Sequence, residues 1–371
     1  MSLILNDDLT MLAESAAGFL RAQAPVGAIR RLREAGQGHD PAVWRQMVDM
    51  GWPAAALPEA YGGLGFGYRG LGVLMEEMGR NLTAAPLYTS AFVAAPLILR
   101  GGSETQKDDL LPRLAAGELT LSLAVDETPQ HAPDRIAMVA RPAGDGFVLS
   151  GRKLFVPDVA TADRFIVAAR PEGGAGLLLL LVARDAPGLA IEPLSLVDER
   201  SYGRLVFDGV VATEVIGTAA EGEAVLAHAL AVANIGLAAE LYGIARQAHD
   251  LTVDYLKQRR QFGVLIGSFQ ALQHRASHMA AELEMALSAL RAALLAIDEG
   301  DPRLELIASA AKLKLSRLAH LVTAEAIQMH GGMGMTDEAD IGFYLKRARV
   351  AQQLYGGRSY HADRYAALKG Y

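Results

Sequence analysis

Three long stretches of the chain repeat apolar residues every three or four positions, and this spacing limits the fold more than any other feature. The stretches span residues 226–255, 272–297 and 304–329. Such spacing places the apolar residues on one face of a helix. Because long helices with short connections pack side by side, we predict an antiparallel helical bundle for the C-terminal part of the chain.

The middle of the chain has a different period. Short segments there alternate or run apolar, and turn signals such as AGDG, PEGGAG and DAPG separate them. The predicted strands are LTLSLAV, IAMVA, GFVLSG, RFIVAA, LLLLLVA and LVFDGV. Six or more short strands at this spacing favour a small barrel or a sandwich.

Helix-start and helix-stop signals mark the N-terminal part. Asp40 precedes Pro41, which is typical of an N-cap followed by proline at the first helical position. Ser103 and Gln106 form a capping-box pattern, and Gly117 predicts the end of that helix. We therefore predict an α+β chain with helical residues 1–117, strands in 118–216 and helices in 217–371.

Composition excludes several classes of protein. The chain has 371 residues, of which 51% are hydrophobic and 21% charged, so it can bury a large core. A net charge of −7 argues against nucleic acid as a partner, because phosphate binding needs a basic surface. The absence of cysteine excludes disulfides, thiolate nucleophiles and cysteine-ligated metals.

Targeting and membrane signals are weak. The N-terminus carries Asp7 and Asp8 and has no basic-then-apolar pattern of a signal peptide. The longest apolar run, Leu177–Ala183, is too short to span a bilayer. We expect a cytoplasmic protein that has no membrane partner.

Two familiar patterns are poor candidates for function. Gly65 to Gly70 matches the spacing GxGxxG, but a dinucleotide site needs a preceding strand, and this segment lies in a helical region. His274 and His278 lie four apart on one helix face, yet no glutamate of a zinc motif and no third ligand accompany them. We predict a loop for the first pattern and no metal site for the second.

Two other segments combine chemistry suited to a nucleotide. YLKQRRQFGVLIGSFQ at 255–270 crowds arginines, glutamines and aromatics at a helix end. QMHGGMG at 328–334 ends another helix with glycines, which let backbone approach a ligand closely. A guanidinium fork suits a pyrophosphate and an aromatic ring suits a purine. A charged helix end with a loop is the alternative interpretation of the first segment.

Taken together, these segments resemble the acyl-CoA dehydrogenase family of flavoproteins, and the resemblance covers nearly the whole chain. GWPAAALPEAYGGLGF, EEMGR, SETQKDDLLPRLAAGEL, GRKLF and FDGVVATEVIG also resemble family segments, while RRQFGVLIGSFQ and QMHGGMG are the most specific. The resemblance implies an N-terminal helical domain, a middle small β-barrel and a C-terminal antiparallel four-helix bundle. It also implies an FAD cofactor and an acyl-CoA substrate.

The resemblance assigns cofactor contacts residue by residue. Arg259 and Gln261 would contact the pyrophosphate region of FAD. The residues that would line its ribityl-pyrophosphate and adenosine end are Phe262, Phe269, Gln270, Gln328, Gly331 and Gly332. In this family that end of FAD is held across a subunit interface, so the cofactor would lie mainly in a neighbouring subunit. A dimer or tetramer is implied.

The family's catalytic glutamate is missing at both of its known positions. Family members remove the α-proton of the acyl-CoA with a carboxylate, because that proton is weakly acidic. Gly356 stands at the position in the family's Tyr-Glu-Gly segment, and Ala233 stands at the alternative position, 29 residues before Phe262. Glu240 is seven residues further on, about 10 Å along the helix. It is a poor substitute.

The segment that faces the flavin ring in the family also departs from the pattern. Where the family has Thr-Glu-Pro-Gly-Ala-Gly-Ser-Asp, residues 125–134 are VDETPQHAPD and lack the glycines. The family's Trp-Ile-Thr appears as Phe-Val-Pro, so Pro157 offers neither a hydroxyl nor an N–H. Arg358 follows the glycines and could face a polar acyl tail or simply lie in solvent at a helix start.

Residues serving the chain's own flavin ring and base are lost, whereas residues that would hold a neighbour's FAD remain. The leading hypothesis is that the chain resembles the partner subunit of heteromeric family members, which lacks the catalytic glutamate. One alternative is an active homo-oligomeric dehydrogenase with an unusual base, such as Glu240 or Asp126. Two others are different flavin chemistry, such as nitroalkane oxidation or oxygenation, and a non-enzymatic assembly protein.

Overall fold

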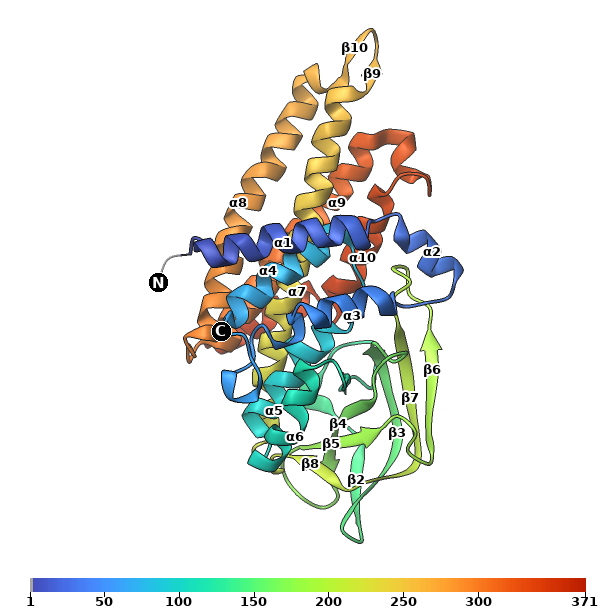
Figure 1. Ribbon diagram of the computed structural model, residues 1–371, viewed down its shortest axis with the longest axis vertical. Helices are drawn as coiled ribbons and strands as arrows, with labels where there is room; N and C mark the ends of the chain where they lie inside the picture. Colours follow the sequence, from blue (N-terminus) through green and yellow to red (C-terminus); the bar gives the residue numbers. More distant parts are fainter. Residues whose placement is uncertain (1–2) are drawn as a thin grey trace. The chain divides into compact units, whose positions relative to one another are not determined.

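The computed structural model describes residues 3–371, which form two compact units (Figure 1). The helical unit comprises residues up to Arg31, Tyr68–Thr83 and Asn234–Tyr371. The sheet unit comprises Leu32–Gly67 and Ala84–Ala233. The predicted order of helical, strand and helical regions is confirmed, while the domain boundaries at 117 and 216 remain predictions.

Long helices build the helical unit. The helices within it are α1 (Asp7–Gln23), α8 (Gln270–Asp298), α9 (Leu304–His330), α10 (Ile341–Gln353) and α11 (Arg358–Leu368). Three more helices lie partly in it and cross its boundary, namely α2 (Ala28–Glu34), α4 (Gly67–Asn81) and α7 (Gly222–Gln258). Helices α7, α8 and α9 carry the three apolar stripes that the sequence predicts, and much of each stripe is buried. The stripes therefore form the core of this unit.

Glycine allows α4 and α7 to touch backbone to backbone. A Cβ at Gly243 of α7 would lie 1.9 Å from the carbonyl oxygen of Glu76. A Cβ at Gly79 of α4 would lie 2.3 Å from the carbonyl oxygen of Glu240. No larger residue fits at either position without separating the two helices. This close approach positions the polar residues of α7 that are described below.

A mixed sheet forms the core of the sheet unit. Its strands are β1 (Leu121–Ala124), β2 (Val139–Ala143), β3 (Gly146–Pro157), β4 (Arg164–Pro171), β5 (Leu178–Ala183), β6 (Leu189–Leu194), β7 (Tyr202–Ala212) and β8 (Glu214–Ile216). They follow the order β6-β7-β3-β2-β4-β5-β8, and β1 pairs in parallel with β4. The side chains of Phe165, Leu180 and Leu205 lie in its core.

The sequence did not indicate β6, for a local reason. This strand contains Glu192 and Pro193, none of its residues is fully buried, and it pairs only with β7 at one edge of the sheet. An edge strand tolerates proline and polar residues, so it lacks the apolar run that marks a central strand.

Short helices complete the sheet unit, and their caps agree with the sequence. They are α3 (Pro41–Asp49), the π-helix η3 (Tyr88–Ala94), α5 (Ala95–Gly101) and α6 (Glu104–Ala115). Asp40 caps α3 by accepting from Ala42 N at 2.8 Å. At α6, the Ser103 hydroxyl accepts from Gln106 N at 3.2 Å, and Gln106 Oε1 accepts from Ser103 N at 3.0 Å. The predicted N-cap and capping box are confirmed.

Replacing Ser103 by alanine should lower the free energy of unfolding by about 1 kcal/mol, because an amide of the first turn of α6 loses its acceptor. Chemical denaturation followed by circular dichroism measures the change. Ser277→Ala, at a site within α8 that is not fully buried, is the control and should change stability by only a few tenths of a kcal/mol. Equal midpoints for the two variants would contradict the assignment.

Candidate functional site

A two-residue turn presents aromatic and basic groups at the end of α7. Strands β9 (Arg260–Gln261) and β10 (Val264–Leu265) pair antiparallel around Phe262 and Gly263. These two residues have φ of 53° and 82°, as a type I′ hairpin requires. Phenylalanine rarely adopts a left-handed backbone, so Phe262 is a strained residue of the kind that collects at ligand sites.

The predicted cofactor residues of this hairpin are open to solvent. The Phe262 side chain is 90% exposed, and its ring lies 6.3 Å from that of Phe269 at 76°. Arg259 and Gln261 are exposed, and Gln270 begins α8. Arg259 makes no ion pair with any residue in the described range 3–371. The hairpin therefore offers a free guanidinium and an uncovered aromatic ring.

The second predicted segment ends α9 beside the end of α7. The ring of Tyr255 stacks on His330 at 4.4 Å between centroids, and its hydroxyl donates to the His330 carbonyl at 3.4 Å. Gln328 is exposed, and a Cβ at Gly331 or Gly332 would meet no atom within 4 Å. Both segments thus lie at the same end of the helical unit, and both suit the phosphate and adenosine end of a dinucleotide.

Gly356 lies in a backbone conformation that excludes a side chain. Its φ is 107°, and the preceding Tyr355 has φ of 54°. A Cβ at Gly356 would lie 2.4 Å from Cδ1 of Tyr360 and 3.0 Å from Nε2 of His361. Glycine alone tolerates such a φ. The position of the family glutamate is therefore closed both by backbone conformation and by neighbouring rings.

A buried lysine holds this segment in place. Nζ of Lys312 donates to the Leu354 carbonyl at 2.7 Å and to Asn234 Oδ1 at 3.2 Å, and lies 3.5 Å from the Gly356 carbonyl. Nδ2 of Asn234 donates to the Tyr355 carbonyl at 3.3 Å. Burial, with the charge of Arg347 adding to it, lowers the pKa of Lys312 to about 7.

The sequence pattern did not predict roles for Lys312 and Asn234. One signal was available, because Lys312 follows Ala311 directly within the apolar stripe of α9. A charged residue inside an apolar stripe needs several polar partners. The partners come from α7 and from the α10–α11 connection, which are distant in sequence, so the stripe alone could not identify them.

Two further positions considered for a base, both on α7, are also closed. Ala233 is fully buried, and its carbonyl accepts from the Tyr88 hydroxyl at 3.2 Å. Glu240, 1% exposed, forms a bidentate ion pair with Arg347 at 2.8 and 2.7 Å. Removing a proton with this carboxylate would leave the Arg347 charge buried and uncompensated. Glu240 is therefore a structural residue.

In the sheet unit, the loop after β1 uses its polar groups internally. Glu127 accepts from Ala137 N at 2.7 Å, from Met138 N at 3.0 Å and from Nζ of the buried Lys153 at 2.7 Å. Asp126 Oδ1 lies 2.7 Å from His131 Nδ1. Pro157 ends β3 and is buried. Most polar groups of this loop are therefore already engaged.

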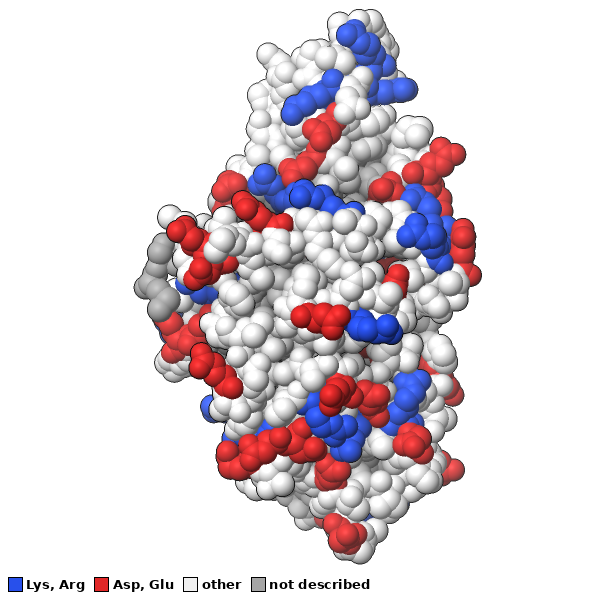
Figure 2. All heavy atoms as spheres, in the orientation of Figure 1, with Lys and Arg blue, Asp and Glu red and all other residues white. Residues whose placement is uncertain are grey.

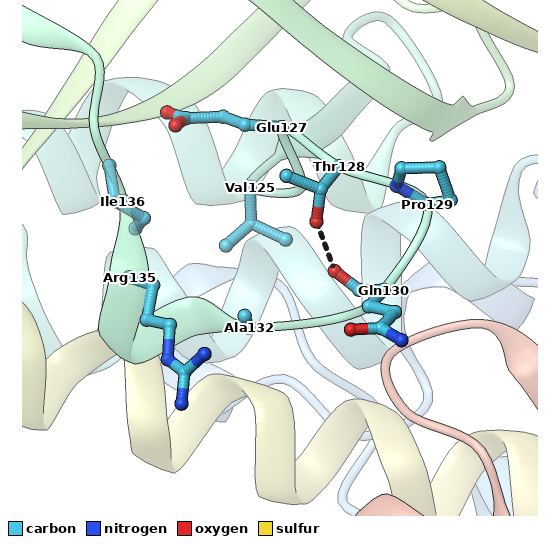
Figure 3. A pocket seen from close by; sticks show the side chains of 8 residues that line it. All are labelled: Val125, Glu127, Thr128, Pro129, Gln130, Ala132, Arg135 and Ile136. Carbon is cyan, nitrogen blue, oxygen red and sulfur yellow. Dashed lines mark hydrogen bonds between the residues drawn. The ribbon is translucent and has the colours of Figure 1, made fainter.

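This loop surrounds a cavity of about 440 Å³ (Figure 3). Its lining consists of Val125, Glu127, Thr128, Pro129, Gln130, Ala132, Arg135 and Ile136. The Thr128 hydroxyl, which faces the Gln130 backbone in Figure 3, donates to that carbonyl at 2.8 Å. The loop thus has a hollow, but it lacks the glycines that would let its backbone approach a flavin ring.

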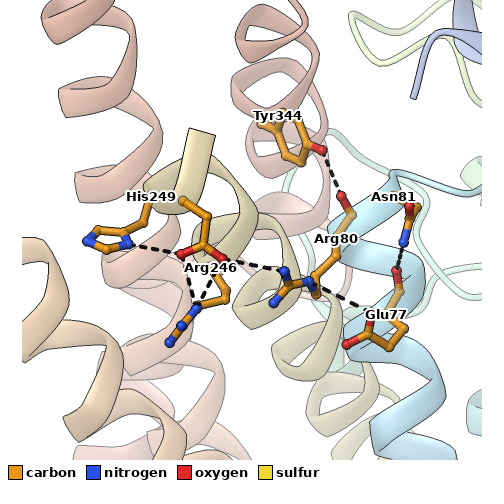
Figure 4. A network of polar contacts seen from close by, with 7 residues as sticks. Glu77, Arg80, Asn81, Arg246, His249 and Tyr344 are labelled. Atoms are coloured by element: carbon orange, nitrogen blue, oxygen red, sulfur yellow. Dashed lines mark hydrogen bonds and ion pairs between the residues drawn. The ribbon is translucent and has the colours of Figure 1, made fainter. Parts of the chain in front are cut away.

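A second cavity, of about 400 Å³, lies in the helical unit. Arg80 and Tyr344 of its lining belong to an ionic network (Figure 4). Asp250 lies 3.4 Å from Arg80 and 3.3 Å from Arg246. Burial alone would raise the pKa of Asp250, but a hydrogen bond from His249 and the two arginine charges hold it below its ordinary value. The Tyr344 hydroxyl donates to the Arg80 carbonyl at 2.7 Å. The network joins α4, α7 and α10.

The remaining sequence patterns lie apart from these groups. Gly65 and Gly67 have φ of 74° and 65°, and the turn they form leads into α4 after a 3₁₀ helix at Glu59–Tyr61. His274 and His278 are exposed on α8, and within residues 3–371 no three acidic or histidine side chains cluster as metal ligands.

Helix α7 is long and apolar enough to cross a membrane, but 83% of its apolar window is buried within the protein, as in a core helix.

The charged residues of the visible face are distributed in both signs (Figure 2). Patches of lysine and arginine and patches of aspartate and glutamate are scattered over a largely uncharged face, without a continuous basic stripe. A nucleic-acid partner would need such a stripe. The absence of a nucleic-acid partner stays a prediction from the net charge of −7.

Comparison with known proteins agrees with this geometry. Residues 6–118 match the family model of the acyl-CoA dehydrogenase N-terminal domain, and residues 220–367 match that of the C-terminal domain. Cyclohex-1-ene-1-carbonyl-CoA dehydrogenase of Geobacter metallireducens is 33% identical over 313 residues, which are 81% of this chain and 82% of that protein.

Solved structures resemble the chain over nearly its whole length. A variant of the steroid ACAD Tcur3481-Tcur3483 is 32% identical with a TM-score of 0.90, over 98% of both chains. The ChsE4-ChsE5 complex of Mycobacterium tuberculosis is 25% identical with a TM-score of 0.91, over 100% of this chain and 99% of that one.

The low pKa of Lys312 predicts how stability depends on pH. Its folded pKa of about 7 is below the ordinary 10.5, so the unfolded chain binds more protons between these values. The free energy of unfolding should therefore rise with pH above 7, by up to about 1 kcal/mol per pH unit. Denaturation at several pH values measures this slope.

Lys312→Met should remove that slope and also lower stability by about 1–3 kcal/mol, because buried carbonyls lose their donor. Lys314→Met is the control, since Lys314 is partly exposed and lies 2.7 Å from Glu282. It should keep the slope. The same slope in the Lys312 variant as in the unmodified chain would contradict the assignment.

Proposed function

The chain belongs to the acyl-CoA dehydrogenase family, and we propose that it is the subunit without a catalytic base in a heteromeric FAD-dependent acyl-CoA dehydrogenase. Homologues in this family are FAD-dependent oxidoreductases that act on CH–CH groups. When bound, FAD would supply the hydride acceptor for the β-carbon of the thioester. The α-proton goes to a carboxylate, which another subunit would supply.

The backbone conformation and the surroundings of Gly356 carry this proposal. Because its φ is 107° and the Tyr360 ring lies only 2.4 Å from where a Cβ would lie, a glutamate here would strain the backbone and displace that ring. Ala233 carries no acidic group, and the carboxylate of Glu240 is engaged by Arg347. Each of the three positions considered for a base on these helices therefore lacks an available carboxylate.

The exposed hairpin supports the second part of the proposal, that this chain helps to hold FAD in a neighbouring subunit. Arg259 would bind a phosphate oxygen of FAD seated in the neighbouring subunit, and Phe262 would stack against its adenosine end. Gly331 and Gly332 would let backbone amides approach the same group. These residues fit the cofactor because they are exposed and unhindered in the single chain.

Two of the similar structures favour a heteromer over a homo-oligomer. Their names, Tcur3481-Tcur3483 and ChsE4-ChsE5, each join two different chains. A dimer or tetramer with a related chain, in the cytoplasm, is the assembly that we propose. The name of the first contains the word steroid, which makes a bulky polycyclic acyl-CoA a reasonable substrate to test first.

One observation favours a second function, that of an active dehydrogenase with an unusual base. Asp126 and His131 lie 2.7 Å apart in the loop that lines the 440 Å³ cavity. A carboxylate that orients an imidazole is a common arrangement for proton transfer. Flavin bleaching by acyl-CoA in the isolated chain, abolished by His131→Gln, would favour this function.

Gly356→Glu should not create dehydrogenase activity in the isolated chain, because the new side chain must displace Tyr360 and adopt a strained φ. Bleaching of FAD by acyl-CoA measures activity. Gly356→Ala carries the same backbone strain without a carboxylate, so it is the matched control. Substrate-dependent bleaching in the glutamate variant alone would contradict the proposal.

Arg259→Gln should weaken FAD binding in the assembled complex by about tenfold or more, because a charge-assisted bond to phosphate is lost. The flavin retained per complex after gel filtration measures the effect. The neighbouring Arg260→Gln, in β9, is the control and should retain more flavin. Equal flavin content in both variants would count against the role of Arg259.

A further inference from the structure

Three exposed arginines on neighbouring helices have no acidic partner. They are Arg317 of α9, Arg349 of α10 and Arg358, the first residue of α11. No carboxylate in the described part of the chain lies within 4.0 Å of any of these guanidinium groups. In a chain with net charge −7, many other arginines find such a partner, so three unpaired ones together form a local excess of positive charge.

Contacts along α9 place these arginines near one another. The Lys312 bonds fix the α10–α11 connection beside residue 312, and Arg364 binds Glu305 at 2.5 Å further down. Both α10 and α11 therefore run antiparallel to α9. Since one helical turn is 3.6 residues, the turn of α10 that contains Arg349 lies beside residues 316–320. The start of α11 lies beside the preceding turn of α9.

A histidine lies among the same arginines, and their positive charge affects its pKa. His320 is one turn from Arg317 on α9, so the two side chains share a face. Burial, and then the positive charges of Arg349 and Arg358, lower the pKa of His320. Its Nδ1 is buried and has no hydrogen-bond partner in the described structure. The imidazole thus faces positive charge without a compensating anion.

The start of α11 adds backbone donors. Gly357 is its N-cap and supplies no side-chain acceptor, so the amides of the first turn are not capped by it. Alone, an uncapped helix start indicates nothing. Combined with three unpaired guanidiniums and an imidazole, it gives a concentration of donors that suits a tetrahedral dianion.

We propose that Arg317, Arg349 and Arg358, with His320 and the first turn of α11, form a binding site for a phosphate group. The site is distinct from the hairpin of Arg259 and does not depend on the proposed dehydrogenase function. Free phosphate and the diphosphate of a nucleotide share this chemistry. Guanidinium forks favour phosphate because they can bind two of its oxygens at once.

The test is a titration of the full chain with inorganic phosphate. The NMR signals of the His320 imidazole report binding. A bound dianion should raise the pKa of His320. Arg349→Gln combined with Arg358→Gln should weaken phosphate binding by about tenfold or more. Arg152→Gln, at an exposed unpaired arginine of β3, is the matched control and should leave binding unchanged.

Parallel titrations with pyrophosphate and ADP identify the source of the phosphate. Binding of ADP about tenfold or more tighter than phosphate would assign the site to a nucleotide, and equal affinities would assign it to free phosphate. Arg259→Gln should not affect any of these titrations, which separates this site from the FAD proposal. The inference is overturned if the His320 signals do not respond to phosphate, or if the double variant binds it as well as the unmodified chain.

Discussion

The ammonium group of Lys312 is the interaction on which the C-terminal part of the helical unit depends. It is fully buried and collects oxygens from α7 and from the α10–α11 connection. A buried charge must be surrounded by polar partners, so the carbonyls of this connection have to turn inward. That requirement is met with Tyr355 at φ 54° and Gly356 at φ 107°. The conformation that satisfies the lysine is one that favours glycine at the position of the family base.

Pairing of buried and partly buried charges extends through the unit. The Glu240 carboxylate is held by Arg347, and Asp250 is held by Arg80 and Arg246. By contrast, Arg259, Phe262 and the glycines after α9 are exposed. These inward-facing charges are therefore paired, while groups suited to a nucleotide face outward. The proposed role beside a neighbouring active site requires such outward-facing groups.

The sequence predicts regular structure well where one local period dominates. The stripes of α7, α8 and α9 and the capping box of Ser103 appear as expected, because each depends on residues a few positions apart. The identity of Gly356 was also readable. Its closure by Tyr360 and the clamp of Lys312 were not, because they depend on backbone angles and on partners from other helices. The grouping of Arg349 and Arg358 around His320 was not readable for the same reason, since both are distant from it in sequence.

The visible absorption spectrum of the purified chain tests the central claim most directly. The chain is expressed alone, supplied with excess FAD and freed of unbound cofactor, and then co-expressed with a homologous chain that carries the glutamate. The account predicts a colourless protein alone and a yellow complex with the partner. A flavin spectrum retained by the isolated chain would contradict it, because the ring site would then be complete within this chain.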